Sequence, residues 1–216
     1  MEERESVKNR DGKKVLLQMV SAIQENKGYL SEVDGLIGDG DHGMNMNKGF
    51  TLFGERIKER DISFTDGLNE LGSLLFNEIG GSMGPIYGAV FTGMAEAGDG
   101  LDEIDGAGFA AMLDRGIREL GDIVDAKVGD KTLVDTLAPA RDALNGALAK
   151  GAGFVEALGA MKAGAAAGRD ATKDMAAKFG RSSRLGERSR GVLDAGAVSC
   201  CIILTAMADG LAHESA

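Results

Sequence analysis

The chain has 216 residues and a formal net charge of −10, so it is a poor candidate for binding nucleic acid or an anionic membrane surface, which both attract basic proteins. It has no uninterrupted apolar run of 18 residues and no apolar leader behind its charged first residues, which predicts neither a transmembrane helix nor a signal peptide. Its two cysteines, Cys200 and Cys201, lie side by side in an apolar stretch. We therefore expect a cytoplasmic protein with two buried thiols and a single domain over residues 1–216.

Apolar residues recur at helical spacing along almost the whole chain. They predict helices over residues 15–23, 46–57, 68–75, 86–97, 109–120, 133–148, 154–179 and 197–211. The first is expected to end near Gly28, Pro85 to open the fourth, and Gly180 to stop the seventh. No segment alternates at period two, so no strand is expected. Short connections favour antiparallel neighbours, which predicts an all-α barrel or bundle of about eight antiparallel amphipathic helices.

The segment SEVDGLIGDGDHGMNMNKGF, residues 31–50, is the sharpest feature of the sequence. Asp34, Asp39 and Asp41 flank a glycine-rich turn that can point their side chains the same way. Three carboxylates held close together repel unless a cation neutralises them, and oxygen ligands suit Mg²⁺ or Ca²⁺ better than zinc. Because a Mg²⁺ site usually keeps positions for phosphate, the segment predicts a metal-bound nucleotide.

Other interpretations of the same residues are weaker. The glycines spell G-x-G-x-x-G, but no strand precedes them and no βαβ unit surrounds them. An EF-hand starting at Asp39 would need a glutamate where Phe50 stands, and the Gly-Lys pair of a Walker A loop is absent. A solvated acidic turn that caps a helix remains the structural alternative.

Residues next to the aspartates extend the predicted site. His42 is a candidate donor to a phosphate oxygen, a base, or a group that orients an aspartate. Asn45 and Asn47 begin the next predicted helix, whose N-terminus favours an anion.

Three later loops carry related signals. GGSMGPIYG, residues 80–88, exposes backbone N–H groups where a helix begins, and Ser82 adds a hydroxyl, although an ordinary turn between helices would look the same. In GDKTLVDT, residues 129–136, Thr132 and Asp135 resemble a capping box, while Leu133 could line an adenine pocket. Residues 181–190 hold four arginines and one acid, which suits phosphate, an acidic partner, or a surface ion-pair network. Asp194 is a candidate N-cap, nucleotide contact, or both.

The four segments IGDGDHGMNMNKGF, GGSMGPIYG, GDKTLVDTLAPA and GRSSRLGERSRGVLDAG, in this order, resemble the nucleotide-binding domain of dihydroxyacetone kinases, the DhaL family. The resemblance covers nearly the whole chain. It implies a barrel of eight antiparallel helices that binds ADP or ATP at one end.

The resemblance also implies roles for individual residues. Asp34, Asp39 and Asp41 would hold two Mg²⁺ ions that bridge the phosphates. The implied nucleotide-binding residues are His42, Asn45, Gly81, Ser82, Met83, Thr132, Leu133, Arg181 and Asp194.

The main hypothesis is an ADP- or ATP-binding phosphoryl-transfer subunit of a kinase for dihydroxyacetone or a related short ketose such as erythrulose. No protein nucleophile is expected, because catalysis would come from positioning and electrostatics. The resemblance implies a separate DhaK-like substrate-binding subunit, and the phosphate source is either ATP or a phosphohistidine-bearing subunit of the phosphotransferase system. The alternatives are a non-catalytic ADP-binding regulatory or docking module and a metal-dependent hydrolase.

Overall fold

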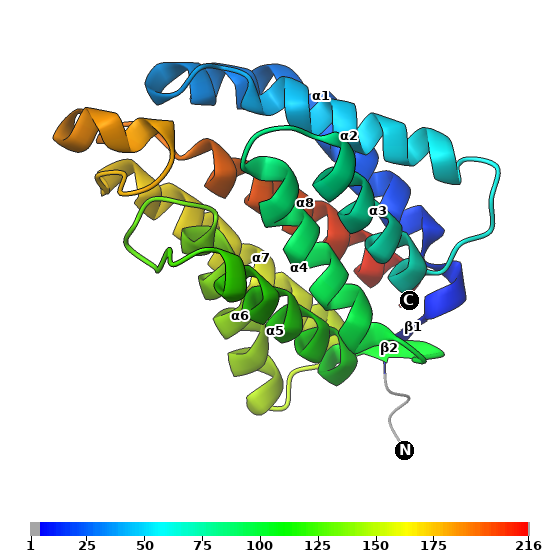
Figure 1. Ribbon diagram of the computed structural model, residues 1–216. Coiled ribbons are helices and arrows are strands. Elements are labelled where there is room, and N and C mark those ends of the chain that lie inside the picture. The colour runs from blue at the N-terminus through cyan, green and yellow to red at the C-terminus, as the bar shows by residue number, and fades with distance from the viewer. Residues whose placement is uncertain (1–4, 216) are drawn as a thin grey trace.

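The computed structural model describes residues 5–215, which form eight α-helices and a two-stranded sheet (Figure 1). The helices are α1 (Lys13–Ile37), α2 (His42–Ile57), α3 (Phe64–Glu78), α4 (Met83–Gly98), α5 (Gly106–Ile123), α6 (Val134–Ala149), α7 (Phe154–Ala171) and α8 (Ala195–Glu214). Short 3₁₀ helices cover Asn9–Asp11, Thr172–Asp174 and Arg181–Ser189. The predicted all-α bundle of eight helices is confirmed.

Neighbouring helices pack in antiparallel pairs around one apolar interior. α1 lies against α2 and α8, α3 against α4, α4 against α5, and α6 against α7, which also contacts α8. The predicted stripes on α2 and α3 are buried, as are the predicted core positions of α8 and both cysteines, which are free thiols. On α4, Ile86 and Ala97, which are predicted to face the interior, are only partly buried, whereas Tyr87 and Phe91 are buried.

By length and composition, α8 is apolar enough to cross a membrane, with a mean hydropathy of 1.7 over an 18-residue stretch. However, 72% of that stretch is buried inside the protein. Such burial is what the core helix of a helical bundle shows, so apolar composition here reflects packing against α1 and α7.

The expectation that the first helix ends near Gly28 is wrong, because α1 continues to Ile37. Leu30 and Val33 extend the buried stripe beyond the glycine, and their burial outweighs the cost of about 1 kcal/mol for a glycine inside a helix. As a result, Asp34 lies on the last turn of α1 rather than in a loop.

The seventh helix is shorter than predicted, since α7 ends at Ala171 and not at Phe179. A 3₁₀ turn follows, and Met175 has an extended backbone. Gly180 does adopt a left-handed φ of 68°, but it precedes the 3₁₀ helix Arg181–Ser189 instead of ending a helix. The alanine-rich composition favours a helix throughout, yet the chain here must leave the bundle to reach the start of α8.

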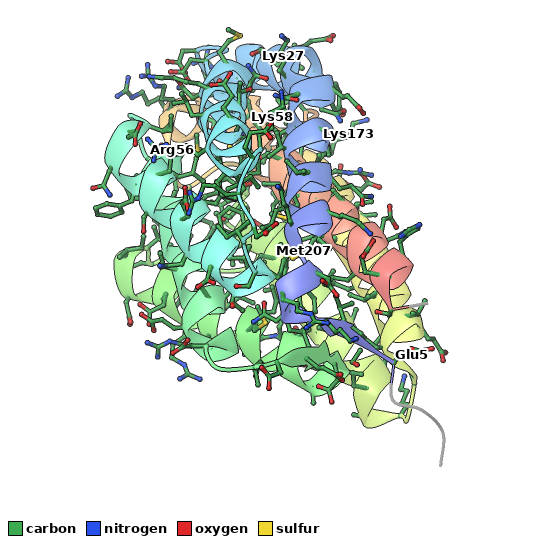
Figure 2. All side chains as sticks on the ribbon, turned by 90° about the vertical axis from the view of Figure 1, so that its right-hand side faces the viewer. Glu5, Lys27, Arg56, Lys58, Lys173 and Met207 are labelled. Carbon is green, nitrogen blue, oxygen red and sulfur yellow. The ribbon has the colours of Figure 1, made fainter. Side chains whose placement is uncertain are left out.

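The expectation of no strands is also wrong. β1 (Ser6–Lys8) and β2 (Glu103–Asp105) pair antiparallel, and each buries its central side chain, Val7 or Ile104. Three-residue strands are too short to show a periodic signal. The sheet lies at the opposite end of the bundle from the segment Arg181–Ser189 (Figure 1). Figure 2 shows Glu5 at the end of the bundle that carries the sheet, whereas Lys27 and Lys173 lie toward the other end. The Glu5 carboxylate accepts the Val155 N–H at 2.8 Å.

Candidate functional site

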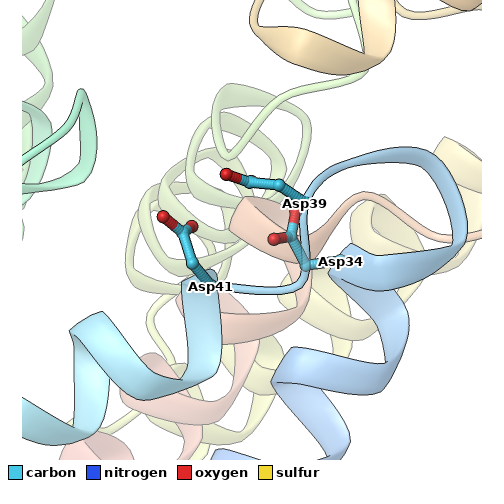
Figure 3. A group of neighbouring side chains, drawn as sticks. All are labelled: Asp34, Asp39 and Asp41. Carbon is cyan, nitrogen blue, oxygen red and sulfur yellow. The ribbon is translucent and has the colours of Figure 1, made fainter.

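The three aspartates of the glycine-rich turn converge. Asp34 comes from the last turn of α1, Asp39 from the connecting loop and Asp41 from the residue before α2 (Figure 3). One carboxylate oxygen from each lies within 4.8 Å of the others. Gly38 permits this turn because a Cβ there would approach an Asp34 oxygen to 2.4 Å, and Gly40 supplies a left-handed φ of 77°.

The acidic turn does not act as a helix cap. Asp41 occupies the N-cap position of α2, but its side chain makes no capping hydrogen bond. The Asp34 carboxylate accepts the His42 N–H at 3.3 Å, a long contact that leaves most of its capacity for another partner. The arrangement therefore favours a cation site over the capping alternative.

The aspartates form one wall of a cavity of about 380 Å³. All nine predicted nucleotide-binding residues line the same cavity: His42, Asn45, Gly81, Ser82, Met83, Thr132, Leu133, Arg181 and Asp194. Asn47, also considered from the sequence, does not line it. The structure thus brings together residues from five segments that are up to 160 positions apart in the chain.

The N-termini of α2, α4, α6 and α8 contribute lining residues to this cavity. Antiparallel packing explains the coincidence, since alternate helices then begin at the same end of the bundle. Free N–H groups at a helix N-terminus and the positive end of the helix dipole both favour anions. The cavity therefore combines a carboxylate cluster for a cation with the starts of α2 and α4, whose N-cap side chains make no capping hydrogen bond and which suit phosphate.

Arg181 connects the arginine-rich segment to the aspartates. Its guanidinium lies 2.9 Å from a carboxylate oxygen of Asp39, while its side chain stays 65% exposed. An exposed ion pair of this kind is weak, at about 0–1 kcal/mol, so a more highly charged ligand of Asp39 can displace it.

Side-chain to backbone hydrogen bonds within Gly129–Asp135 hold the segment that leads into α6. The Asp135 carboxylate accepts the Thr132 N–H at 2.7 Å and the Gly129 N–H at 2.6 Å, and the Thr132 hydroxyl accepts the Val134 N–H at 3.2 Å. Half of the expected capping box is present: Asp135 accepts the Thr132 N–H, but Thr132 accepts from Val134 instead of Asp135, and the N-cap residue of α6 is Leu133. Capping thus holds Thr132 and Leu133 in the cavity wall.

The surroundings shift the pKa values of His42 and Asp194, two of the titratable groups that line the cavity. Burial lowers the pKa of His42 from its usual value, against the opposing pull of Asp34 and Asp41. Burial raises the pKa of Asp194 to about 6, although its carboxylate accepts the Ala197 N–H at 2.8 Å as the N-cap of α8. The sequence-based expectation that Asp194 caps the last helix is confirmed.

Several cavity residues were not predicted from the sequence. Ile37, Ile86, Tyr87, Val124 and Phe179 form its apolar lining. Lys131 also reaches it, with a side chain that is 1% exposed and an ammonium that donates to the carbonyls of Thr172 and Val192. An apolar residue in a helical stripe looks the same whether it faces a core or a ligand, so the sequence carries no signal for these positions.

Comparisons with known proteins match most of the chain. Residues 36–209 match the DAK2 domain. The chain is 36% identical over 186 residues to the PEP-dependent dihydroxyacetone kinase 1, ADP-binding subunit DhaL, of Listeria innocua, covering 86% of this chain and 88% of that one. It is 33% identical over 183 residues to the corresponding DhaL subunit of Escherichia coli, covering 83% and 86%.

Solved structures share the fold. The crystal structure of the dihydroxyacetone kinase of C. freundii in complex with AMP-PNP and Mg²⁺ superposes with a TM-score of 0.67 at 20% identity. The match covers 96% of this chain and 35% of the kinase, so this chain corresponds to about a third of that protein.

Proposed function

This chain belongs to the DAK2 domain family, and from that premise we propose that it is the ADP-binding, phosphoryl-transfer subunit of a dihydroxyacetone-type kinase. The observation that carries the proposal is the convergence of three carboxylates with four helix N-termini on one cavity. We propose that residues 1–216 act as a single nucleotide-binding domain.

The donor set fits magnesium. Asp34, Asp39 and Asp41 offer three hard oxygen ligands within 4.8 Å of one another, and their one contact with a helix start is the long hydrogen bond from the His42 N–H to Asp34. We propose that they hold Mg²⁺, two ions in the full site, which would neutralise charge on the phosphates of the bound nucleotide. No Asp of this cluster has to act as a nucleophile.

The rest of the cavity would bind and orient the nucleotide. Backbone N–H groups at Gly81, Ser82 and Met83, where α4 begins, suit phosphate oxygens. Thr132 and Leu133 lie beside the apolar lining and suit the adenine end. Arg181 is positioned to contact a phosphate once Asp39 binds the metal, which would close the cavity.

The partners follow from the relatives and from what this chain offers. Relatives named as PEP-dependent subunits support a phosphohistidine of the phosphotransferase system as the phosphate source, with ADP retained. A relative of Mycolicibacterium smegmatis, at 33% identity over 35% of its length, is named L-erythrulose 1-kinase, so another short ketose is the alternative acceptor. We propose a DhaK-like subunit as the ketose-binding partner and the cytoplasm as the location, consistent with two free thiols.

The proposal is tested by calorimetric titration of ADP into nucleotide-stripped protein. We expect binding in Mg²⁺ and loss of binding in EDTA, because bare phosphates would meet three uncompensated carboxylates. Asp39→Asn and Asp41→Asn should each weaken binding at least about tenfold, the order of magnitude of losing a charged metal ligand.

Asp61→Asn is the matched control. Asp61 is exposed and follows the far end of α2, about 25 Å from His42 along a 16-residue helix. The Asp61→Asn variant should bind ADP with the same affinity as the unsubstituted protein. Absence of ADP binding in Mg²⁺, or equal binding in EDTA, would show that the aspartates serve another purpose.

A further inference from the structure

A buried hydrogen-bonded chain lies behind the aspartate cluster and connects three helices. His42 at the start of α2 places Nε2 2.8 Å from the Oγ of Ser199 on α8. The same Oγ lies 2.7 Å from the hydroxyl of Tyr87 on α4. Ser199 and Tyr87 are 0% and 3% exposed. Of these three residues, His42 and Tyr87 line the cavity and Ser199 does not.

The number of protons that His42, Ser199 and Tyr87 can donate favours one arrangement of their hydrogen bonds. Both hydroxyls also lie near the Gly196 carbonyl, at 3.1 Å from Ser199 and 3.3 Å from Tyr87. A carbonyl only accepts, and each hydroxyl has one proton to donate. If Ser199 donates to the carbonyl, Tyr87 donates to Ser199; if Tyr87 donates to the carbonyl, Ser199 donates to Tyr87.

In both of these arrangements the Ser199 proton is already used, so the contact with His42 is a hydrogen bond only if Nε2–H donates to Ser199. If Ser199 donated to Nε2 instead, one fewer hydrogen bond would form among the four groups. Buried polar groups rarely give up an available hydrogen bond, because an unsatisfied group costs more than the bond contributes.

We infer that Ser199, supported by Tyr87, is a positioning residue that holds the His42 imidazole in one orientation at the cavity wall by accepting its Nε2–H. This inference rests on the proposed function and assigns a role to two residues outside the metal cluster. A ring held in one orientation does not have to be ordered when the nucleotide binds, which improves affinity.

A double-substitution cycle with ADP binding in Mg²⁺ tests whether Ser199 acts through His42. Ser199→Ala should weaken ADP binding about fivefold, the order of magnitude of one lost hydrogen bond. In a His42→Ala background the same substitution should have less than about a twofold effect, because the ring it positions is gone. An equal loss in both backgrounds would overturn the inference, since it would reveal a purely structural role.

Two further variants separate positioning from general destabilisation. Tyr87→Phe removes one hydroxyl while keeping the ring, and it should weaken binding in the same direction as Ser199→Ala. Thr136→Val removes another buried hydroxyl that bonds to α8, at the Ala197 carbonyl, without touching His42. It should leave ADP affinity unchanged even if the melting temperature falls; a loss matching that of Ser199→Ala would contradict the inference.

Nuclear magnetic resonance of the histidine rings supplies a readout that does not depend on nucleotide. The chain has two histidines, and the side chain of His213 is 83% exposed and serves as an internal reference. In protein labelled with ¹⁵N-histidine, the Nε2–H proton of His42 should be protected from exchange and become visible, and Ser199→Ala should remove that protection. A protected proton on Nδ1 instead would overturn the assignment. If the unsubstituted chain bound no ADP, the proposed function would fail, while this spectrum would still decide whether Ser199 holds the ring.

Discussion

At the scale of single residues, the aspartates that line the cavity or lie next to it have different tasks, which the groups around them determine. Asp135 and Asp194 accept backbone N–H groups at the starts of α6 and α8. Asp41 is the N-cap residue of α2, as Asp194 is of α8, yet the Asp41 side chain makes no capping hydrogen bond and lies beside Asp34 and Asp39. Identical side chains thus serve either the fold or the candidate metal site.

The raised pKa of Asp194 predicts a pH dependence of stability. A carboxyl with a pKa of about 6 in the folded protein and 3.8 in the unfolded chain binds its proton more tightly when folded. Its contribution to the free energy of unfolding therefore falls as the pH rises from about 4 to about 6 and stays low above that, by up to about 3 kcal/mol.

Asp194→Asn keeps an acceptor for the Ala197 N–H and removes the buried charge. Urea unfolding in EDTA without nucleotide should find the variant more stable than the unsubstituted protein at pH 8 and closely similar at pH 4. Asp61→Asn, at an exposed site, should show no such trend. A constant difference for Asp194→Asn at both pH values would mean that this carboxyl has an ordinary pKa.

At the scale of elements, glycines on α1 and α2 set how the two helices bring the aspartates together. A Cβ on Gly43 would lie 2.1 Å from the Lys27 carbonyl oxygen and 2.6 Å from the Ser31 nitrogen, so the backbones of α1 and α2 are in close contact there. Gly28, by contrast, is exposed on α1, and nothing lies within 4 Å of its Cβ position.

The two glycines therefore predict substitutions of opposite sign. Gly43→Ala should lower the free energy of unfolding by about 1–3 kcal/mol, because backbone atoms must move apart, and it should also weaken Mg²⁺-dependent ADP binding. Gly28→Ala should raise stability by about 0.5–1 kcal/mol, because alanine favours a helix interior. Chemical denaturation measures both; a destabilising Gly28→Ala would contradict an α1 that continues through residue 28.

At the scale of the whole molecule, the segment Arg181–Ser189, whose Arg181 lines the cavity, lies at one end of the bundle and the small sheet at the other (Figure 1). The two histidines have different surroundings: His42 lines the cavity, whereas His213 is exposed on the last turn of α8. We propose that the apolar lining and the aspartate cluster together hold a nucleotide and that the ketose is held by a partner.

The isolated chain is therefore expected to bind ADP but not to phosphorylate dihydroxyacetone at a kinase rate with either ATP or a phosphohistidine donor. Addition of a DhaK-like subunit should restore turnover, measured by coupled detection of the ketose phosphate. Binding without turnover in the presence of all partners would favour a docking module, and release of free phosphate without any acceptor would favour a hydrolase.

The sequence by itself determined that most of the chain is helical and which segments carry the candidate site residues. Apolar spacing of 3.6 residues is a local property, so α2, α3 and α5 could be predicted, and the aspartates of residues 34–41 are too close in the chain to be separated by folding. Local reasoning failed where tertiary packing overrides it, as when burial of Leu30 and Val33 carries α1 through Gly28, or when Val7 and Ile104 pair across about a hundred residues.

Only the tertiary structure decided what surrounds the aspartates. Lys131, Tyr87 and Ser199 carry no signal in the sequence, because a buried polar group is recognisable only from the partners that satisfy it. Those partners, such as the Val192 carbonyl for Lys131 and His42 for Ser199, come from segments about 60 to 160 residues away. Antiparallel packing brings these segments to the same end of the bundle, and the cavity exists because of that packing.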